Sequence, residues 1–92
     1  MKIIKRSGME ETFDIEKIIS AMNRANREAP ETERLTTKQI HEAASHVTEI
    51  CEGMNRAASV EEIQDLVENE IMRLQQYEVA RKYITYRYTR SM

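Results

Sequence analysis

The apolar residues of this chain recur mainly at helical spacing. From residue 15 onward they return every three or four positions, which places them on one face of a helix: Ile15, Ile18, Ile19 and Met22. The same spacing is found over residues 36–52 and 59–74, and a shorter apolar stripe follows residue 76. The pattern predicts four amphipathic helices. The last of them is expected to bury Val79, Ala80, Tyr83 and Ile84.

The starts of the first three helices are marked by capping residues. Asp14, Thr36 and Ser59 carry side-chain oxygens that accept hydrogen bonds from the backbone N–H groups left free in a first helical turn. Gln39 and Glu62 stand three positions after Thr36 and Ser59, so these pairs are typical of capping boxes. The caps are the firmest local signals in the sequence.

The helix ends are marked less uniformly. Pro30 predicts that the first helix ends near residues 27–29, and Gly53 predicts the end of the second helix. Neither Gly nor Pro separates the third helix from the fourth, and we place that break near Gln75 and Gln76.

Two short β-capable segments precede the first helix. Residues 2–6 contain the pair Ile3-Ile4, and residues 10–13 follow a turn that contains Gly8, so together they predict a β-hairpin. Residues 31–35 are charged and without period, and we expect a loop or a short third strand there. The predicted fold class is α+β, mostly α: a bundle of about four helices capped by an N-terminal β-hairpin or a small three-stranded sheet, in one domain over residues 1–92.

Composition narrows the possible functions. A chain of 92 residues is one small domain, and burying about 60 to 65% of its surface leaves little room for an enzyme with a deep cleft. The net charge of −2 argues against binding to nucleic acid or to membranes. Cys51 is the single cysteine and falls in an apolar helical pattern, which predicts a buried thiol. No membrane span or signal peptide is recognisable, so we expect a cytoplasmic protein.

Several chemistries can be set aside. His41 and His46 are five positions apart, which turns them roughly 140° away from each other on a helix, whereas a zinc-binding HExxH motif keeps its histidines on one face. The chain has no GxxxxGK[ST] loop and no GxGxxG fingerprint. Tyrosines and arginines gather in the last helix and would suit stacking on RNA bases or on one purine ring. Core and surface packing explains the same residues more simply.

Lys5, Arg6 and Lys17 form the strongest candidate site. The first two precede the Gly-bearing turn, and Lys17 lies in the first turn of the first helix. A helix N-terminus offers free N–H groups and a partial positive charge, so the arrangement predicts a site for phosphate or another polyanion. The alternative from spacing alone is a solvated surface, where cations beside hairpin turns are common.

The order of these motifs resembles a known family, the ATP-cone. This nucleotide-binding regulatory module is found at the N-terminus of many ribonucleotide reductases and in a bacterial repressor of their genes. The resemblance covers essentially the whole chain and rests on the strings IIKRSGMEETFDIEKIISAMNRA, LTTKQIHEAA, VEEIQDLVE and VARKYITYRYTR. Its most specific parts are the K-R-x-G turn with F-D-x-x-K-I after it, and the ending V-A-x-x-Y-I-x-Y-R.

The resemblance implies a set of nucleotide-binding residues. The phosphates would be held by Lys5, Arg6 and Lys17. The nucleotide would be lined by Glu11, Thr12, Phe13, Asp14 and Ile15. The pocket would be closed from the second helix by Thr37 and His41, and a late cation would come from Arg87 or Arg90. Glu11, as an acceptor, would suit a donor such as the adenine amino group.

The resemblance also implies a function. The ligand would be ATP or dATP with Mg²⁺, bound reversibly without hydrolysis, and this chain would be a regulatory domain and not itself an enzyme. Its partners would be the catalytic domain of a parent reductase and further copies of the chain. The ending YITYRYTR resembles the anaerobic type of reductase more than the aerobic one. The sequence stops where such a catalytic domain would begin, so we expect a fragment or a free-standing cone.

Three alternatives remain open. One is a helical module that binds a protein partner and no nucleotide. Another is the cone of the gene repressor, whose paired CxxC motifs are missing from this sequence. The third is a small nucleotide-hydrolysing enzyme, which would need a metal-binding carboxylate and a base to position water beside the phosphates.

Overall fold

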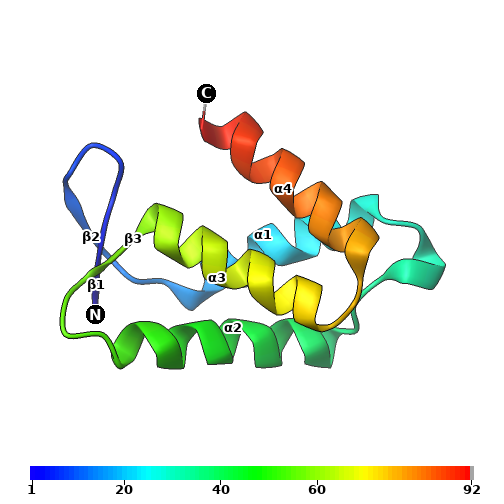
Figure 1. Cartoon of the computed structure of the whole chain (residues 1–92), viewed down its shortest axis with the longest axis horizontal. Helices are drawn as coiled ribbons and strands as arrows, with labels where there is room; N and C mark the ends of the chain where they lie inside the picture. Colours follow the sequence, from blue (N-terminus) through cyan, green and yellow to red (C-terminus); the bar gives the residue numbers. More distant parts are fainter. Residues whose placement is uncertain (92) are drawn as a thin grey trace.

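The computed structural model describes residues 1–91, with the side chains of residues 1–89, and shows four helices and a small sheet (Figure 1). The helices are α1 (Ile15–Glu28), α2 (Thr37–Glu52), α3 (Val60–Arg73) and α4 (Tyr77–Ser91). The strands are β1 (Lys2–Ile4), β2 (Glu10–Thr12) and β3 (Ala58–Ser59), and a 3₁₀ turn, η1, spans Glu31–Glu33. The predicted fold class is confirmed.

The helices begin where the capping residues predict. The Asp14 carboxylate accepts a hydrogen bond from the backbone N–H of Glu16 at 3.0 Å. Thr36 and Ser59 each take part in a capping box in which both reciprocal hydrogen bonds form. These bonds satisfy backbone donors that would otherwise lack a partner at the start of each helix.

The break between α3 and α4 lies at the predicted place. Helix α3 ends at Arg73, and Gln75 has a φ of 63°, in the left-handed region. A residue in this conformation commonly ends a helix, and glycine is its usual occupant. Here the position is occupied by glutamine, so no glycine or proline marks the break in the sequence. The resulting reversal lets α4 pack against both α1 and α3.

The sheet places the hairpin beside the start of α3. Its strand order is β2-β1-β3, with β1 antiparallel to β2 and parallel to β3. The possible third strand at residues 31–35 is wrong, because residues 31–33 form η1 and the third strand is Ala58–Ser59. The backbone of Leu35 is held instead by the Asn26 side chain, through bonds of 2.7 and 3.0 Å.

The apolar faces of the helices meet in one core. Met22, Val47, Ile71 and Val79 are fully buried, one from each helix. The residues predicted to be buried in α4 are buried, except for Ile84, which is only half-buried. Tyr86 packs on the core from this helix, since residues 79, 83 and 86 share one helical face. No helix within residues 1–91 is long and apolar enough to cross a membrane.

The buried residues include a thiol and a carboxylate. Cys51 is buried as predicted, and this burial raises the pKa of its thiol. Glu70 on α3 is also buried, and its carboxylate contacts His46 Nδ1 on α2 at 2.8 Å and Arg73 Nη2 at 2.9 Å. Burial acts to raise the pKa of Glu70, but the hydrogen bonds and charges of Arg73 and His46 outweigh it and lower that pKa. The ionised carboxylate therefore links α2 to α3.

Acid should weaken the fold through the capping residue Glu62. Its carboxylate accepts hydrogen bonds from Arg56 at 2.6 and 2.7 Å and from the Ser59 N–H at 3.0 Å. Chiefly through the Arg56 bond, these contacts lower the pKa of Glu62 from 4.5 to about 2. A carboxyl group with a lowered pKa stabilises the folded chain above its ordinary pKa, and this contribution is lost as the pH falls through the lowered value.

We therefore expect the free energy of unfolding of the native chain to fall between pH 4.5 and about 2. In Glu62→Gln that fall should be smaller, and the two proteins should converge near pH 2. Urea titrations across this range measure both curves. Glu49→Gln, an exposed carboxylate on α2, is the control and should follow the native chain. A Glu62→Gln curve parallel to the native one would contradict the assignment.

Candidate functional site

A cavity of about 240 Å³ opens between the hairpin, α1, α3 and α4. Its inner wall is apolar and is formed by helix residues, several of them buried: Ile18, Ala21, Ile63, Val67, Tyr83 and Tyr86. Its rim is polar and comes from β2, the start of α1 and α3: Glu11, Thr12, Asp14, Lys17 and Gln64. An apolar interior with a charged rim suits a ligand that has one flat apolar part and one ionic part.

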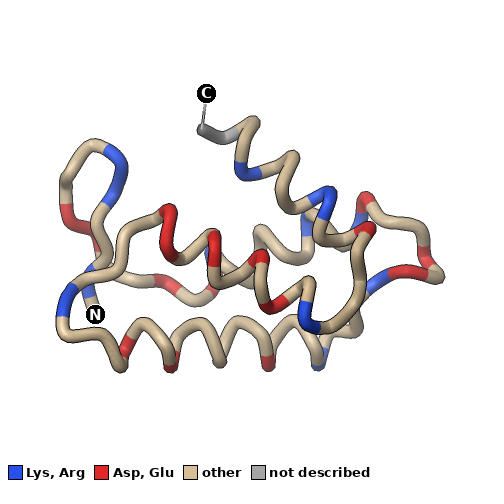
Figure 2. The backbone as a smooth tube through the Cα atoms, in the orientation of Figure 1, with Lys and Arg blue, Asp and Glu red and all other residues tan. Residues whose placement is uncertain are grey.

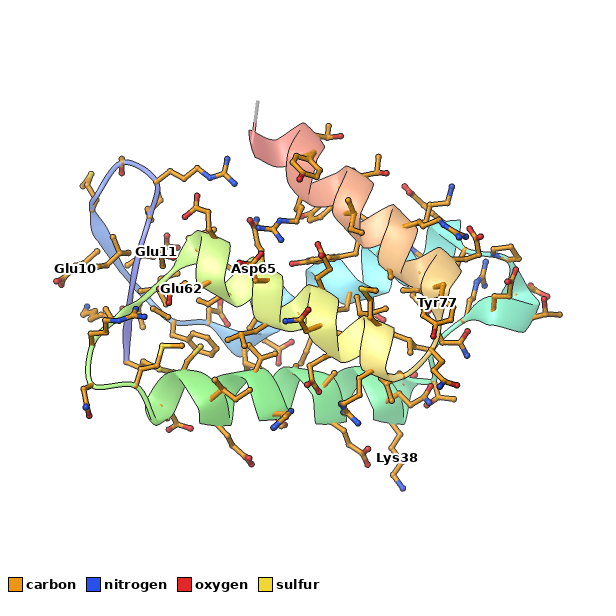
Figure 3. All side chains as sticks on the ribbon, in the orientation of Figure 1. Glu10, Glu11, Lys38, Glu62, Asp65 and Tyr77 are labelled. Atoms are coloured by element: carbon orange, nitrogen blue, oxygen red, sulfur yellow. The ribbon has the colours of Figure 1, made fainter. Side chains whose placement is uncertain are left out.

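Glu11 brings two of the predicted cations together at this rim. Successive strand residues alternate in direction, so Glu10 and Glu11 lie on opposite faces of β2, and Glu11 faces the cavity (Figure 3). Its carboxylate is hydrogen-bonded to Lys17 Nζ, and Lys5 Nζ lies 3.8 Å from its second oxygen. The Lys17 bond and charge, with a smaller contribution from Lys5, lower the pKa of Glu11. The rim therefore carries one ionised acceptor between two ammonium groups.

Arg6 lies on the hairpin turn, outside the cavity lining, and contacts the lining residue Gln64. Gly8 has a φ of 87°, which glycine adopts without strain, and its N–H bonds the Lys5 carbonyl at 2.9 Å. The turn directs Arg6 toward α3, where Arg6 Nε lies 2.6 Å from Glu61 Oε1 and Nη2 lies 3.5 Å from Gln64 Oε1. The basic hairpin turn thus faces the acidic start of α3 (Figure 2).

The N-terminus of α1 is closed by its own cap. The Asp14 side chain accepts from Glu16, and the Asp14 carbonyl accepts from the N–H of Lys17 at 3.1 Å. An anion here would meet the Asp14 carboxylate as well as the helix dipole. The lysine side chains at the rim are therefore better placed than the helix terminus to attract a phosphate.

Thr37 and His41 do not line this cavity. Helix α2 runs toward the sheet, so these residues lie at its far end, away from the hairpin (Figure 1). His41 is exposed and borders a shallow depression on α2 together with Glu42 and Glu49. Helix α2 therefore does not line this cavity, although the resemblance implies that Thr37 and His41 close the nucleotide pocket. The wall opposite β2 is formed instead by α3, with Val60 and Gln64.

Of the two late cations, Arg87 is paired with acidic residues of α3. Arg87 Nη1 lies 2.8 Å from Asp65 Oδ1 and 3.3 Å from Glu68 Oε1, so this side chain joins α4 to α3. The side chain of Arg90 lies outside the described residues. Of the remaining expected residues, Thr12 and Phe13 border the cavity, while Ile15 is half-buried against the core.

Sequence reasoning did not include α3 in the site, and it preferred a packing role for the tyrosines of α4. Tyr83 and Tyr86 belong to the tyrosine and arginine cluster, which was the available signal. Their ring centroids are 6.3 Å apart, and the guanidinium of Arg24 lies 5.3 Å from the centre of the Tyr86 ring. For Gln64 no local signal existed. Among the described residues, no three His, Cys, Asp or Glu side chains are grouped as metal ligands.

Comparison with known proteins identifies the family to which the chain is similar. The family model for the ATP cone domain matches residues 1–92. A ribonucleoside-diphosphate reductase alpha subunit of Chlamydia trachomatis is 31% identical, over 99% of this chain and 10% of the relative. The subunit of the same name from Chlamydia pneumoniae is 33% identical, over 97% and 9%. An anaerobic ribonucleoside-triphosphate reductase of Haemophilus influenzae is 31% identical, over 98% and 12%. The chain thus spans about a tenth of the length of these curated relatives.

Proposed function

Since the chain belongs to the ATP-cone domain family, whose members are nucleotide-binding regulatory domains of ribonucleotide reductases, we propose that it binds ATP or dATP in the cavity beside the hairpin. The observation that carries the proposal is the rim, where Lys5 and Lys17 meet at Glu11 beside an apolar pocket. This rim supplies both the charge that a triphosphate needs and an acceptor for a base.

The cavity suits the base and leaves the phosphates at the rim. Ligand pockets usually measure about 300–1,000 Å³, so a cavity of about 240 Å³ holds part of a nucleotide only. The apolar wall with its two tyrosines would take the flat adenine ring. Lys5, Lys17 and Arg6 would then take the triphosphate, whose charge of about −4 calls for several cations. Any Mg²⁺ would be bound mainly by phosphate oxygens and water.

The ionised Glu11 would favour adenine over guanine. A carboxylate with a lowered pKa remains an acceptor at neutral pH. It can accept a hydrogen bond from the exocyclic amino group of adenine, whereas the carbonyl oxygen of guanine at the same ring position would repel it. The proposed site therefore distinguishes the two purines by whether this ring position donates or accepts a hydrogen bond.

The arrangement supports binding and regulation in preference to hydrolysis. Before nucleotide binds, Glu11 and Glu61 are paired with lysine and arginine and Asp14 caps α1, so none of the three is placed as a free base for activating water. For regulation, ATP and dATP would have to favour different packings of the bundle, and a coupling of about 1 to 3 kcal/mol would suffice. We propose that this difference is passed to a parent reductase through contacts between copies of the chain and with its catalytic domain.

The finer proposal is that the parent enzyme is an anaerobic ribonucleoside-triphosphate reductase in the cytoplasm. The ending YITYRYTR carries this proposal. The relatives include both an anaerobic ribonucleoside-triphosphate reductase and ribonucleoside-diphosphate reductase alpha subunits at similar identity, so identity does not single out the anaerobic enzyme. Activity assays on the parent enzyme under anaerobic conditions, with and without dATP, would test it.

A thermal-shift panel tests the proposed ligand. ATP or dATP at about 100 times its dissociation constant should add about 2.7 kcal/mol to the free energy of unfolding, and GTP or CTP should add less. Calorimetry should give an affinity in the micromolar range, and a phosphate-release assay should show no turnover. If no nucleotide raises the melting temperature, the proposal is wrong, and a helical module that binds only protein partners becomes the better interpretation.

A further inference from the structure

Arg6 forms a bridge over the edge of the cavity. Its guanidinium comes from the hairpin turn and contacts Glu61 at 2.6 Å and Gln64 at 3.5 Å, both on α3. Gln64 lines the cavity, whereas Arg6 and Glu61 stand outside its lining, so the bridge lies beside the α3 wall of the cavity. The Arg6 and Glu61 side chains are 41% and 47% exposed, so solvent reaches the ion pair.

Three acidic side chains near the start of α3 are each paired with a different arginine. Glu62 pairs with Arg56 from the preceding loop, and Asp65 pairs with Arg87 from α4. Glu61 pairs with Arg6 of the hairpin turn. Removing the Glu61 charge therefore changes the Arg6 bridge without taking the partner of either other arginine.

We propose that Glu61 is a positioning residue that holds Arg6 in a closed bridge when no nucleotide is bound, and that a triphosphate displaces Glu61 from this arginine. The inference rests on the proposed function. A carboxylate and a phosphate compete for the same guanidinium donors, because both accept the paired N–H groups of arginine. Nucleotide binding then releases the hairpin from α3 as the phosphates take over Arg6.

The energetic scale makes this exchange feasible. Exposed ion pairs contribute about 0.2–1 kcal/mol, so a phosphate displaces one at small cost. The bridge should lower the affinity for triphosphate by about threefold, within the range of about 1.4-fold to 5-fold that such a pair allows. It should lower the affinity for AMP less, because a single phosphate offers Arg6 fewer oxygens than a triphosphate does.

Calorimetry with ATP and AMP on four proteins tests the inference: the native chain, Glu61→Gln, Glu49→Gln and Arg6→Ala. Glu61→Gln should bind ATP about threefold more tightly than the native chain, with a smaller gain for AMP. Glu49→Gln makes the same change of charge on the exposed face of α2 and should leave both affinities unchanged. Circular dichroism should confirm that the variants are equally folded.

A double variant separates positioning from a general effect of charge. If Glu61 acts through Arg6, adding Glu61→Gln to Arg6→Ala should give no gain over Arg6→Ala alone. A gain of the same size in both backgrounds, or unchanged ATP affinity in Glu61→Gln, would overturn the inference while the proposed function stands. A native chain that binds no ATP would overturn both.

Discussion

Lys17→Ala is expected to weaken ATP binding more than tenfold, the largest effect of any single change at the site. The Lys17 ammonium is hydrogen-bonded to Glu11 at the rim. Its removal takes away one phosphate-binding cation and leaves Glu11 less neutralised, so attraction is lost and repulsion is added. Lys17 is 67% exposed, and alanine is a good helix former, so the fold should be retained.

Lys38→Ala is the matched control for this variant. Lys38 also lies in the first turn of a helix, but its side chain points outward from α2, away from the hairpin (Figure 3). Titration calorimetry at fixed ionic strength should show native affinity for Lys38→Ala and a loss greater than tenfold for Lys17→Ala. If Lys17→Ala keeps native affinity, the phosphates do not lie at this rim.

Ile71→Ala should cause the largest loss of stability. Ile71 is fully buried in α3, and replacing such a side chain by alanine leaves a cavity and costs about 2–5 kcal/mol. A domain of this size has a total stability of about 5–14 kcal/mol. A loss near 3 kcal/mol would lower the melting temperature by roughly 12 to 24 °C.

The adjacent residue provides the control for Ile71→Ala. Met72 lies on the same helix but is 45% exposed, so Met72→Ala should change the stability by less than about 0.5 kcal/mol. Urea unfolding followed by circular dichroism compares the two variants. Equal losses would show that the side of α3 assigned to the core is wrong.

The local elements could be predicted because their causes lie within a few residues. Asp14, Thr36 and Ser59 start helices through hydrogen bonds to residues two or three positions later. The hairpin follows from Gly8 in the same way. At Gln75 the residue type does not reveal the cause of the break, so the position of the break could be predicted but the left-handed conformation could not.

Only the part of the candidate site that comes from one contiguous segment could be predicted. The segment from Glu11 to Lys17 is contiguous, and most of it lines the cavity. The opposite wall could not be chosen, because α2 and α3 both begin with a capping box and present the same local pattern. Contacts between residues far apart in the sequence, such as the pairing of Ile3 with Ala58, decide that α3 lies beside the hairpin. The resemblance also implies Thr37 and His41, which lie on α2 and do not line this cavity, so their part in nucleotide binding stays a prediction.

The parallel pairing of β1 with β3 also sets the order in which the domain can mature. During synthesis the hairpin leaves the ribosome long before Ala58 and Ser59, which complete the sheet. The two walls of the cavity can therefore meet only after more than half of the chain has been made. A nascent chain should gain its affinity for nucleotide late, when α3 and α4 have emerged, and until then the basic turn is exposed without its acidic partner.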